Sequence, residues 1–151
     1  MNRNYDHALK QIEGVVSGEP DLIANLSNIA AILKELKGYF WVGFYLVKED
    51  ELVVGPFQGP VACSRIAKGK GVCGTAWSEN KTLLIQNVHD FPGHIACSPL
   101  SQSEIVVPIH DQNGEIVMVL DVDSSSIGAF REEDQLALEK LAEIITKIIP
   151  A

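Results

Sequence analysis

The chain has 151 residues, of which 46% are hydrophobic and 21% charged, a composition typical of one globular domain with its own core. Its formal net charge of −8 argues against nucleic acid or an anionic membrane surface as the main partner. No apolar run approaches the ~18 residues of a membrane-spanning helix, and residues 1–14 lack the apolar stretch of a secretory signal. We therefore expect a single cytoplasmic domain over residues 1–151.

The first two elements are predicted to be helices. Residues 5–17 have the pattern of a short helix, and residues 21–37 have that of a longer one. In the longer helix, apolar residues recur at the spacing of one helical face: Leu22, Leu26, Ile29, Leu33 and Leu36. Pro20 suits the first turn of this helix, and Gly38 suits its end.

Strand patterns begin near residue 40. Residues 40–47 and 51–57 are predicted to pair as a hairpin across the polar turn between them. Residues 71–80, which follow a glycine-rich stretch, are predicted to form a short helix, and residues 82–86 a short strand. The chain thus changes from helices to a mainly β-strand region.

A long loop then runs from Asn87 to Ser103. At about 17 residues it exceeds the usual length of a connection without secondary structure, and such loops tend to be functional or disordered. Its aromatic, proline and cysteine residues argue against disorder. We therefore expect a functional loop that ends at Glu104, where the next apolar run begins.

Two strands and a helix are predicted to follow. Residues 104–110 and 115–123 flank an Asn-Gly turn, which is a strong hairpin signal. Residues 131–149 form an amphipathic pattern with three acids in the first turn, where they complement the helix dipole. The order of elements predicts an α+β fold, with a central antiparallel sheet and helices packed against it. A doubly wound parallel fold would need crossover helices that are missing here.

The three cysteines form no known short motif. Cys63, Cys73 and Cys97 are 10 and 24 positions apart, unlike the C-x-x-C of a redox pair or a zinc ribbon. Each could be an inert buried thiol or a reactive one. A helix N-terminus would lower the pKa of Cys73, whereas Cys97 lies on the long loop. A Cys₃His zinc site with His94 or His89, and a Cys/His hydrolase, are open alternatives.

Asp121 and Asp123 end an apolar strand and share one of its faces, because side chains alternate along a strand. They could be exposed acids that cap the following turn. Alternatively, they line a cavity together with Glu104, which begins the neighbouring strand. Three carboxylates in one pocket would repel one another, so at least one would stay protonated near neutral pH. Such a pocket would suit an ammonium ligand and could donate a proton to a leaving oxygen.

Trp41 and Tyr45 lie four positions apart on one predicted strand, and therefore on the same face. Core packing is the ordinary explanation for such a pair. Alternatively, the two rings form an apolar wall for a small ligand, with the indole N–H and the phenol hydroxyl each bound to a partner.

Five segments carry a family resemblance that covers nearly the whole chain from Tyr5 onward: GPFQGPVACSRI, GKGVCGTAW, FPGHIAC, SQSEIVVPI and VLDVDS. They resemble the free methionine-(R)-sulfoxide reductases, which are enzymes with the GAF fold. The resemblance implies a GAF-like fold and the reduction of free L-methionine (R)-sulfoxide to L-methionine, an activity of the oxidative-stress response. The sulfoxide would be attacked by a cysteine, and no bound cofactor or metal would be needed.

The resemblance also implies roles for individual residues. Cys97 corresponds to the catalytic nucleophile, Cys63 to its partner in an intramolecular disulfide, and Cys73 to an accessory cysteine. Further residues correspond to the catalytic and substrate-binding acids and to the aromatic pocket: Glu104, Asp121, Asp123, Trp41 and Tyr45. Two positions depart from the family pattern, because Ser98 and Asn87 stand where acids are usual.

The implied reaction cycle uses an external reductant. Cys97 would become a sulfenic acid and then form the disulfide with Cys63. Thioredoxin, itself reduced by NADPH through thioredoxin reductase, would restore the thiols. The family is often dimeric, so a homodimer is among the expectations. The main alternative is a GAF-type sensor that binds a small molecule or an oxidant without turnover.

Overall fold

A six-stranded antiparallel sheet forms the centre of the structure, a computed structural model that describes residues 3–95 and 97–151. In chain order the strands are β1 (Trp41–Lys48), β2 (Glu51–Gln58), β3 (Arg65–Ala67), β4 (Leu83–Ile85), β5 (Ser103–His110) and β6 (Ile116–Ser124). They lie side by side in the order β3-β2-β1-β6-β5-β4, and each neighbouring pair is antiparallel. The α+β fold with a central antiparallel sheet, as predicted from the sequence, is confirmed.

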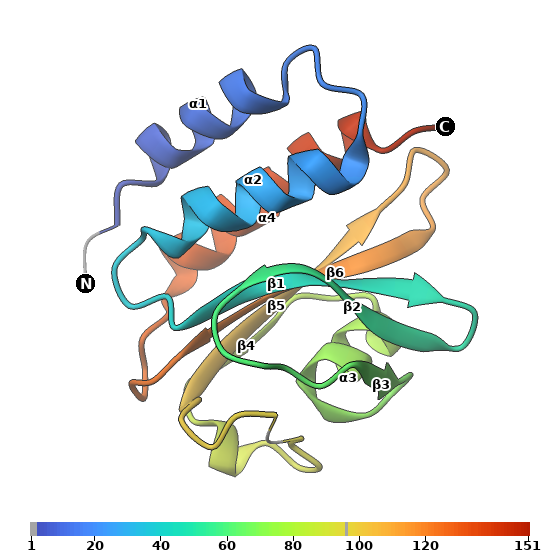
Figure 1. Ribbon diagram of the computed structural model, residues 1–151. Helices are drawn as coiled ribbons and strands as arrows, with labels where there is room; N and C mark the ends of the chain where they lie inside the picture. Colours follow the sequence, from blue (N-terminus) through green and yellow to red (C-terminus); the bar gives the residue numbers. More distant parts are fainter. Residues whose placement is uncertain (1–2, 96) are drawn as a thin grey trace.

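Helices cover both faces of this sheet (Figure 1). Three of them lie on one face: α1 (Tyr5–Val16), α2 (Leu22–Lys34) and α4 (Glu132–Ile148). The short α3 (Gly71–Glu79) packs on the opposite face against β5 and β6. Among the described residues, no helix is long and apolar enough to span a membrane.

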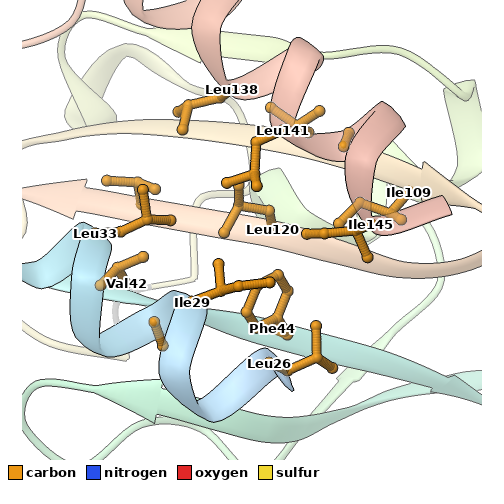
Figure 2. Packing of buried hydrophobic residues seen from close by; sticks show 14 of the residues in the cluster. Leu26, Ile29, Leu33, Val42, Phe44, Ile109, Leu120, Leu138, Leu141 and Ile145 are labelled. Atoms are coloured by element: carbon orange, nitrogen blue, oxygen red, sulfur yellow. The ribbon is translucent and has the colours of Figure 1, made fainter. Parts of the chain in front are cut away.

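The larger core lies between the sheet and the three helices, and Figure 2 shows the part of it that α2, α4 and the sheet form. Leu26, Ile29 and Leu33 project from α2 toward the sheet, at the spacing of one helical face. Val42 and Phe44 of β1 meet them from the sheet and are fully buried. The intervening residues of β1 must therefore face α3, because neighbouring side chains of a strand point to opposite faces.

Several element boundaries differ from the sequence prediction by one to three residues, most at the end of α2, which ends at Lys34 and not at residue 37. Pro20 precedes α2 and is not in its first turn, because the side chain of Asp21 caps the helix by accepting from the Ala24 N–H at 2.9 Å. Strand β3 was not predicted. Only Ile66 of its three residues is buried, and their pairing with β2 is a long-range contact.

The N-terminal segment is tied to the body of the fold by Arg3. Its guanidinium donates to Asp134 Oδ1 at 2.8 Å and to the Lys37 carbonyl at 2.7 Å. The same group lies over the rings of Tyr39 and Phe130. Because both side chains of the Arg3–Asp134 pair are almost completely buried, removing either one would take an opposite charge away from a buried group.

Candidate active site

Strand alternation collects the predicted acids and aromatic residues on the sheet face that carries α3. Trp41 pairs with Asp123 across β1 and β6, and Glu104 pairs with Asp123 across β5 and β6. Asp121 lies two positions before Asp123 on the same face. These side chains line one pocket together with Tyr45, Cys73 and Cys97. The pocket encloses about 50 Å³, which exceeds the roughly 10–15 Å³ that one water molecule requires.

The three acids are buried, so they are not the exposed turn-capping residues that the sequence also allowed. Glu104 and Asp121 are each 6% exposed and Asp123 is 8% exposed. Burial raises the pKa of all three carboxyls, and charge repulsion from Asp121 raises the pKa of the other two further. Burial and mutual repulsion therefore favour the protonated form of these carboxyls, which is the direction expected for acids that converge on one cavity.

Two of the three cysteines form a disulfide beside this pocket. Cys63 and Cys97 are 34 positions apart in the chain, and their sulfurs are bonded with the Cα atoms 5.3 Å apart. Cys63 follows β2, and Cys97 lies on the long loop before β5. Both residues are only partly buried, so an external thiol could reach them. In this state the cysteines do not form a Cys₃His zinc site.

Cys73 lies in the first turn of α3 and is buried against the acids. Its Sγ is 3.9 Å from Glu104 Oε2. The helix N-terminus was expected to lower the pKa of this thiol, but burial raises it and the charges of Asp121 and Glu104 raise it further. Cys73 is therefore a protonated thiol at neutral pH, unlike the activated thiolate that its helix position suggested.

The aromatic pair belongs both to the apolar cluster on this face and to the pocket wall. Trp41 stacks on Tyr45 and on Phe57, with ring centroids 5.9 and 5.1 Å apart. Trp41 Nε1 donates to the Pro60 carbonyl, and the Tyr45 hydroxyl donates to the Cys63 carbonyl, both at 3.0 Å. Tyr45 thus holds the backbone of a disulfide cysteine, a link that the sequence did not reveal.

Gly43 lies between these two rings on the same face of β1. A Cβ at this position would lie 2.3 Å from the Phe57 Cβ and 2.8 Å from a ring carbon of Trp41. Only glycine therefore fits at position 43, beside Phe57 and the ring of Trp41. In the sequence, the indication of this role is a glycine inside an otherwise apolar strand, which often marks a place where another group comes close to the backbone.

His94 lines the same pocket and lies beside Glu104. Its Nε2 is 4.0 Å from Glu104 Oε1. Burial lowers the pKa of His94, and the nearby His89 lowers it further, so the imidazole is neutral at neutral pH.

The two departures from the family pattern have local structural roles. Asn87 Oδ1 accepts from the His89 N–H at 3.0 Å and caps a short 3₁₀ helix, η1 (Val88–Asp90). Ser98 Oγ accepts from the Leu100 N–H at 3.3 Å. Both side chains therefore stabilise turns of the long loop.

This arrangement combines two chemical capabilities. A cysteine pair that can exchange two electrons lies at the wall of a pocket, and the pocket contains carboxyl groups that can donate protons or bind a cation. Pocket residues outside the predicted set, such as Val61, Ile95 and Ser101, come from loops without a periodic pattern.

Comparisons with known proteins agree with this chemistry. The GAF domain family matches residues 21–149. The GAF domain-containing protein A of Dictyostelium discoideum is 56% identical, over 93% of this chain and 89% of its own. The free methionine-R-sulfoxide reductase of Escherichia coli (strain K12) is 45% identical, over 99% of this chain and 92% of its own. An X-ray structure of the Neisseria meningitidis enzyme of that name, in complex with its substrate, superposes with a TM-score of 0.92 at 53% identity and covers 95% of this chain and 87% of that one.

Proposed function

The chain belongs to the free methionine-R-sulfoxide reductases, a family with the GAF fold, and we propose that it reduces free L-methionine (R)-sulfoxide to L-methionine. The family identified from the sequence motifs is thereby confirmed. The observation that carries the proposal is the Cys63–Cys97 disulfide beside a pocket with three buried carboxyls. We further propose that residues 1–151 act as one catalytic domain.

Cys97 is the proposed nucleophile. Its thiolate attacks the sulfoxide sulfur, the oxygen passes to Cys97 as a sulfenic acid, and methionine leaves. The sulfoxide oxygen must gain a proton during this step. Glu104 is the proposed donor, because burial and the charges of the neighbouring acids raise its pKa and so favour its protonated form.

The other pocket residues bind the substrate in this proposal. Asp121 and Asp123 hold the ammonium group, and Trp41 and Tyr45 shelter the methyl group. Asp121 Oδ1 supports this assignment, since it is buried and has no hydrogen-bond partner among the described residues. A peptide bond would remove the ammonium charge of methionine. The enzyme should therefore prefer the free amino acid to a residue within a protein.

Cys63 is the proposed resolving cysteine. Its thiol condenses with the sulfenic acid of Cys97, which forms the disulfide and releases water. Thioredoxin then reduces this disulfide by thiol–disulfide exchange, with electrons that come from NADPH. Such recycling needs a reducing compartment, which supports a cytoplasmic location. The homodimer expected from the family resemblance stays a prediction. Light scattering of the purified protein would test it.

The test is NADPH consumption in the presence of thioredoxin, thioredoxin reductase and the separated R or S epimer of free methionine sulfoxide. We expect oxidation of NADPH with the R epimer alone. Cys97→Ser should abolish it, whereas Ser27→Ala, at an exposed position on α2, should leave it unchanged. If folded and fully reduced protein consumed no NADPH with either epimer, the proposal would be wrong and a GAF-type sensor would be favoured.

A further inference from the structure

The pocket places a thiol and two carboxyls at the spacing of metal ligands. Cys73 Sγ, one oxygen of Glu104 and one oxygen of Asp121 all lie within 4.8 Å of one another, and all three residues are buried. Two ligands of one tetrahedral zinc ion, a sulfur at ~2.3 Å and an oxygen at ~2.1 Å, are about 3.6 Å apart. The separation of 3.9 Å between Cys73 Sγ and Glu104 Oε2 is close to that value.

A second observation points to a cation at this position. Asp121 is 6% exposed and lines the pocket, yet its Oδ1 has no hydrogen-bond partner among the described residues. A buried polar atom without a partner is unfavourable, and a bound cation would compensate this oxygen. The enclosed space of about 50 Å³ can hold an ion together with a water molecule.

The donor atoms indicate which class of ion would bind. Thiolate sulfur suits zinc and similar borderline-soft ions, whereas magnesium and calcium prefer oxygen ligands alone. The His94 imidazole also lines the pocket, with its Nε2 4.0 Å from Glu104 Oε1, and it could supply a nitrogen ligand. A set of sulfur, oxygen and nitrogen donors therefore favours Zn²⁺, Cd²⁺ or Co²⁺.

We propose that Cys73, Glu104 and Asp121 bind a divalent cation of the zinc class in the active-site pocket. The redox pair takes no part, because Cys63 and Cys97 are bonded to each other in the structure that contains this donor set. Binding displaces protons from the thiol and the carboxyls, so affinity rises with pH. The ion occupies carboxylates that the proposed function assigns to the substrate. It should therefore inhibit the reductase competitively with methionine sulfoxide, a consequence that rests on that function.

The test uses Co²⁺ with the metal-free disulfide form of the full chain. Cys73 is the free cysteine in this state, so a sulfur-to-cobalt charge-transfer band can come only from its thiolate. We expect this band to saturate at one Co²⁺ per chain. Cys73→Ser should remove the band and weaken Co²⁺ binding at least tenfold by calorimetry. Glu79→Gln, which changes a half-exposed acid at the end of α3, should leave both unchanged.

A second variant keeps the test valid if Cys73→Ser fails to fold. Asp121→Asn retains the thiol and should weaken Co²⁺ binding at least tenfold, since it replaces a charged ligand by an amide. The proposal is overturned if the folded wild-type protein shows no charge-transfer band, or if both variants bind Co²⁺ as tightly as the wild type. These readouts need no turnover, so a missing reductase activity and a missing metal site would be distinguished.

Discussion

The buried carboxyls should make the stability of the protein depend on pH in an unusual direction, and Asp121→Asn tests this. An oxygen of Glu104 and an oxygen of Asp121 lie within 4.8 Å of each other. If both groups were ionised, their repulsion at an effective dielectric constant of about 20 would be at least about 3.5 kcal/mol. That repulsion favours the form in which one of the two groups keeps its proton, and the loss of hydration on burial acts in the same direction. The native pair therefore keeps a proton that the unfolded chain releases above pH ~4.

The direction in which the free energy of unfolding changes with pH follows from the protons that the native and unfolded states bind. A carboxyl whose native pKa is raised adds stability that is complete below its unfolded pKa and is lost as pH rises toward the native value. While the native state holds one proton more than the unfolded chain, the free energy of unfolding falls by about 1.4 kcal/mol per pH unit. Asp121→Asn removes the repulsion, so the variant should become more stable than the wild type as pH rises.

Urea unfolding of the disulfide form between pH 5 and pH 8, in the presence of a chelator, measures this difference. Asp50→Asn is the matched control, because Asp50 is exposed in the β1–β2 turn. The difference between Asp121→Asn and the wild type should grow with pH, by up to about 1.4 kcal/mol per unit. A difference that is independent of pH, or one that favours the wild type at high pH, would refute the reasoning.

Three further substitutions test the proposed catalytic roles of Cys63 and Glu104 and the buried Arg3–Asp134 ion pair. The Cys63→Ser variant should form one methionine per chain, after which thioredoxin should fail to recycle it. Normal multiple turnover would exclude Cys63 as the resolving residue. Glu104→Gln should slow the single-turnover formation of methionine more than tenfold at neutral pH, because it removes the proton donor, and an unchanged rate would exclude that role. Asp134→Ala should lower the free energy of unfolding by about 3–5 kcal/mol, since it removes the carboxylate that faces the buried Arg3 guanidinium. Urea unfolding measures this loss, and the exposed Glu133→Ala should cost far less. Equal losses in these two variants would show that the buried pair contributes little.

The prediction of elements succeeded where the signal was local. The hydrophobic spacing of α2 and the Asn-Gly turn between β5 and β6 depend only on residues that are neighbours in the chain. The same is true of the shared face of Asp121 and Asp123, which follows from the period of a strand. Strand β3 was missed because only Ile66 of its three residues is buried, whereas the equally short β4 is apolar throughout. The pairing of β3 with β2 is a long-range contact.

The candidate site shows the same division. The motifs identified the family and named Cys63, Cys97 and Glu104, but the residues themselves left three ways to pair the cysteines and two environments for the acids. Only the fold brings Cys63 and Cys97 together across 34 positions of the chain. Only the fold buries Cys73 among carboxyls, which reverses the pKa shift expected from its helix position.

By itself, then, the sequence determined the periods of the helices and strands, the faces that their side chains share and the family. The tertiary structure decided which thiols are bonded and in which direction the pKa values of the buried groups shift. The physical reason is that backbone periodicity arises between residues close in the chain, whereas desolvation and charge repulsion depend on which distant surfaces meet.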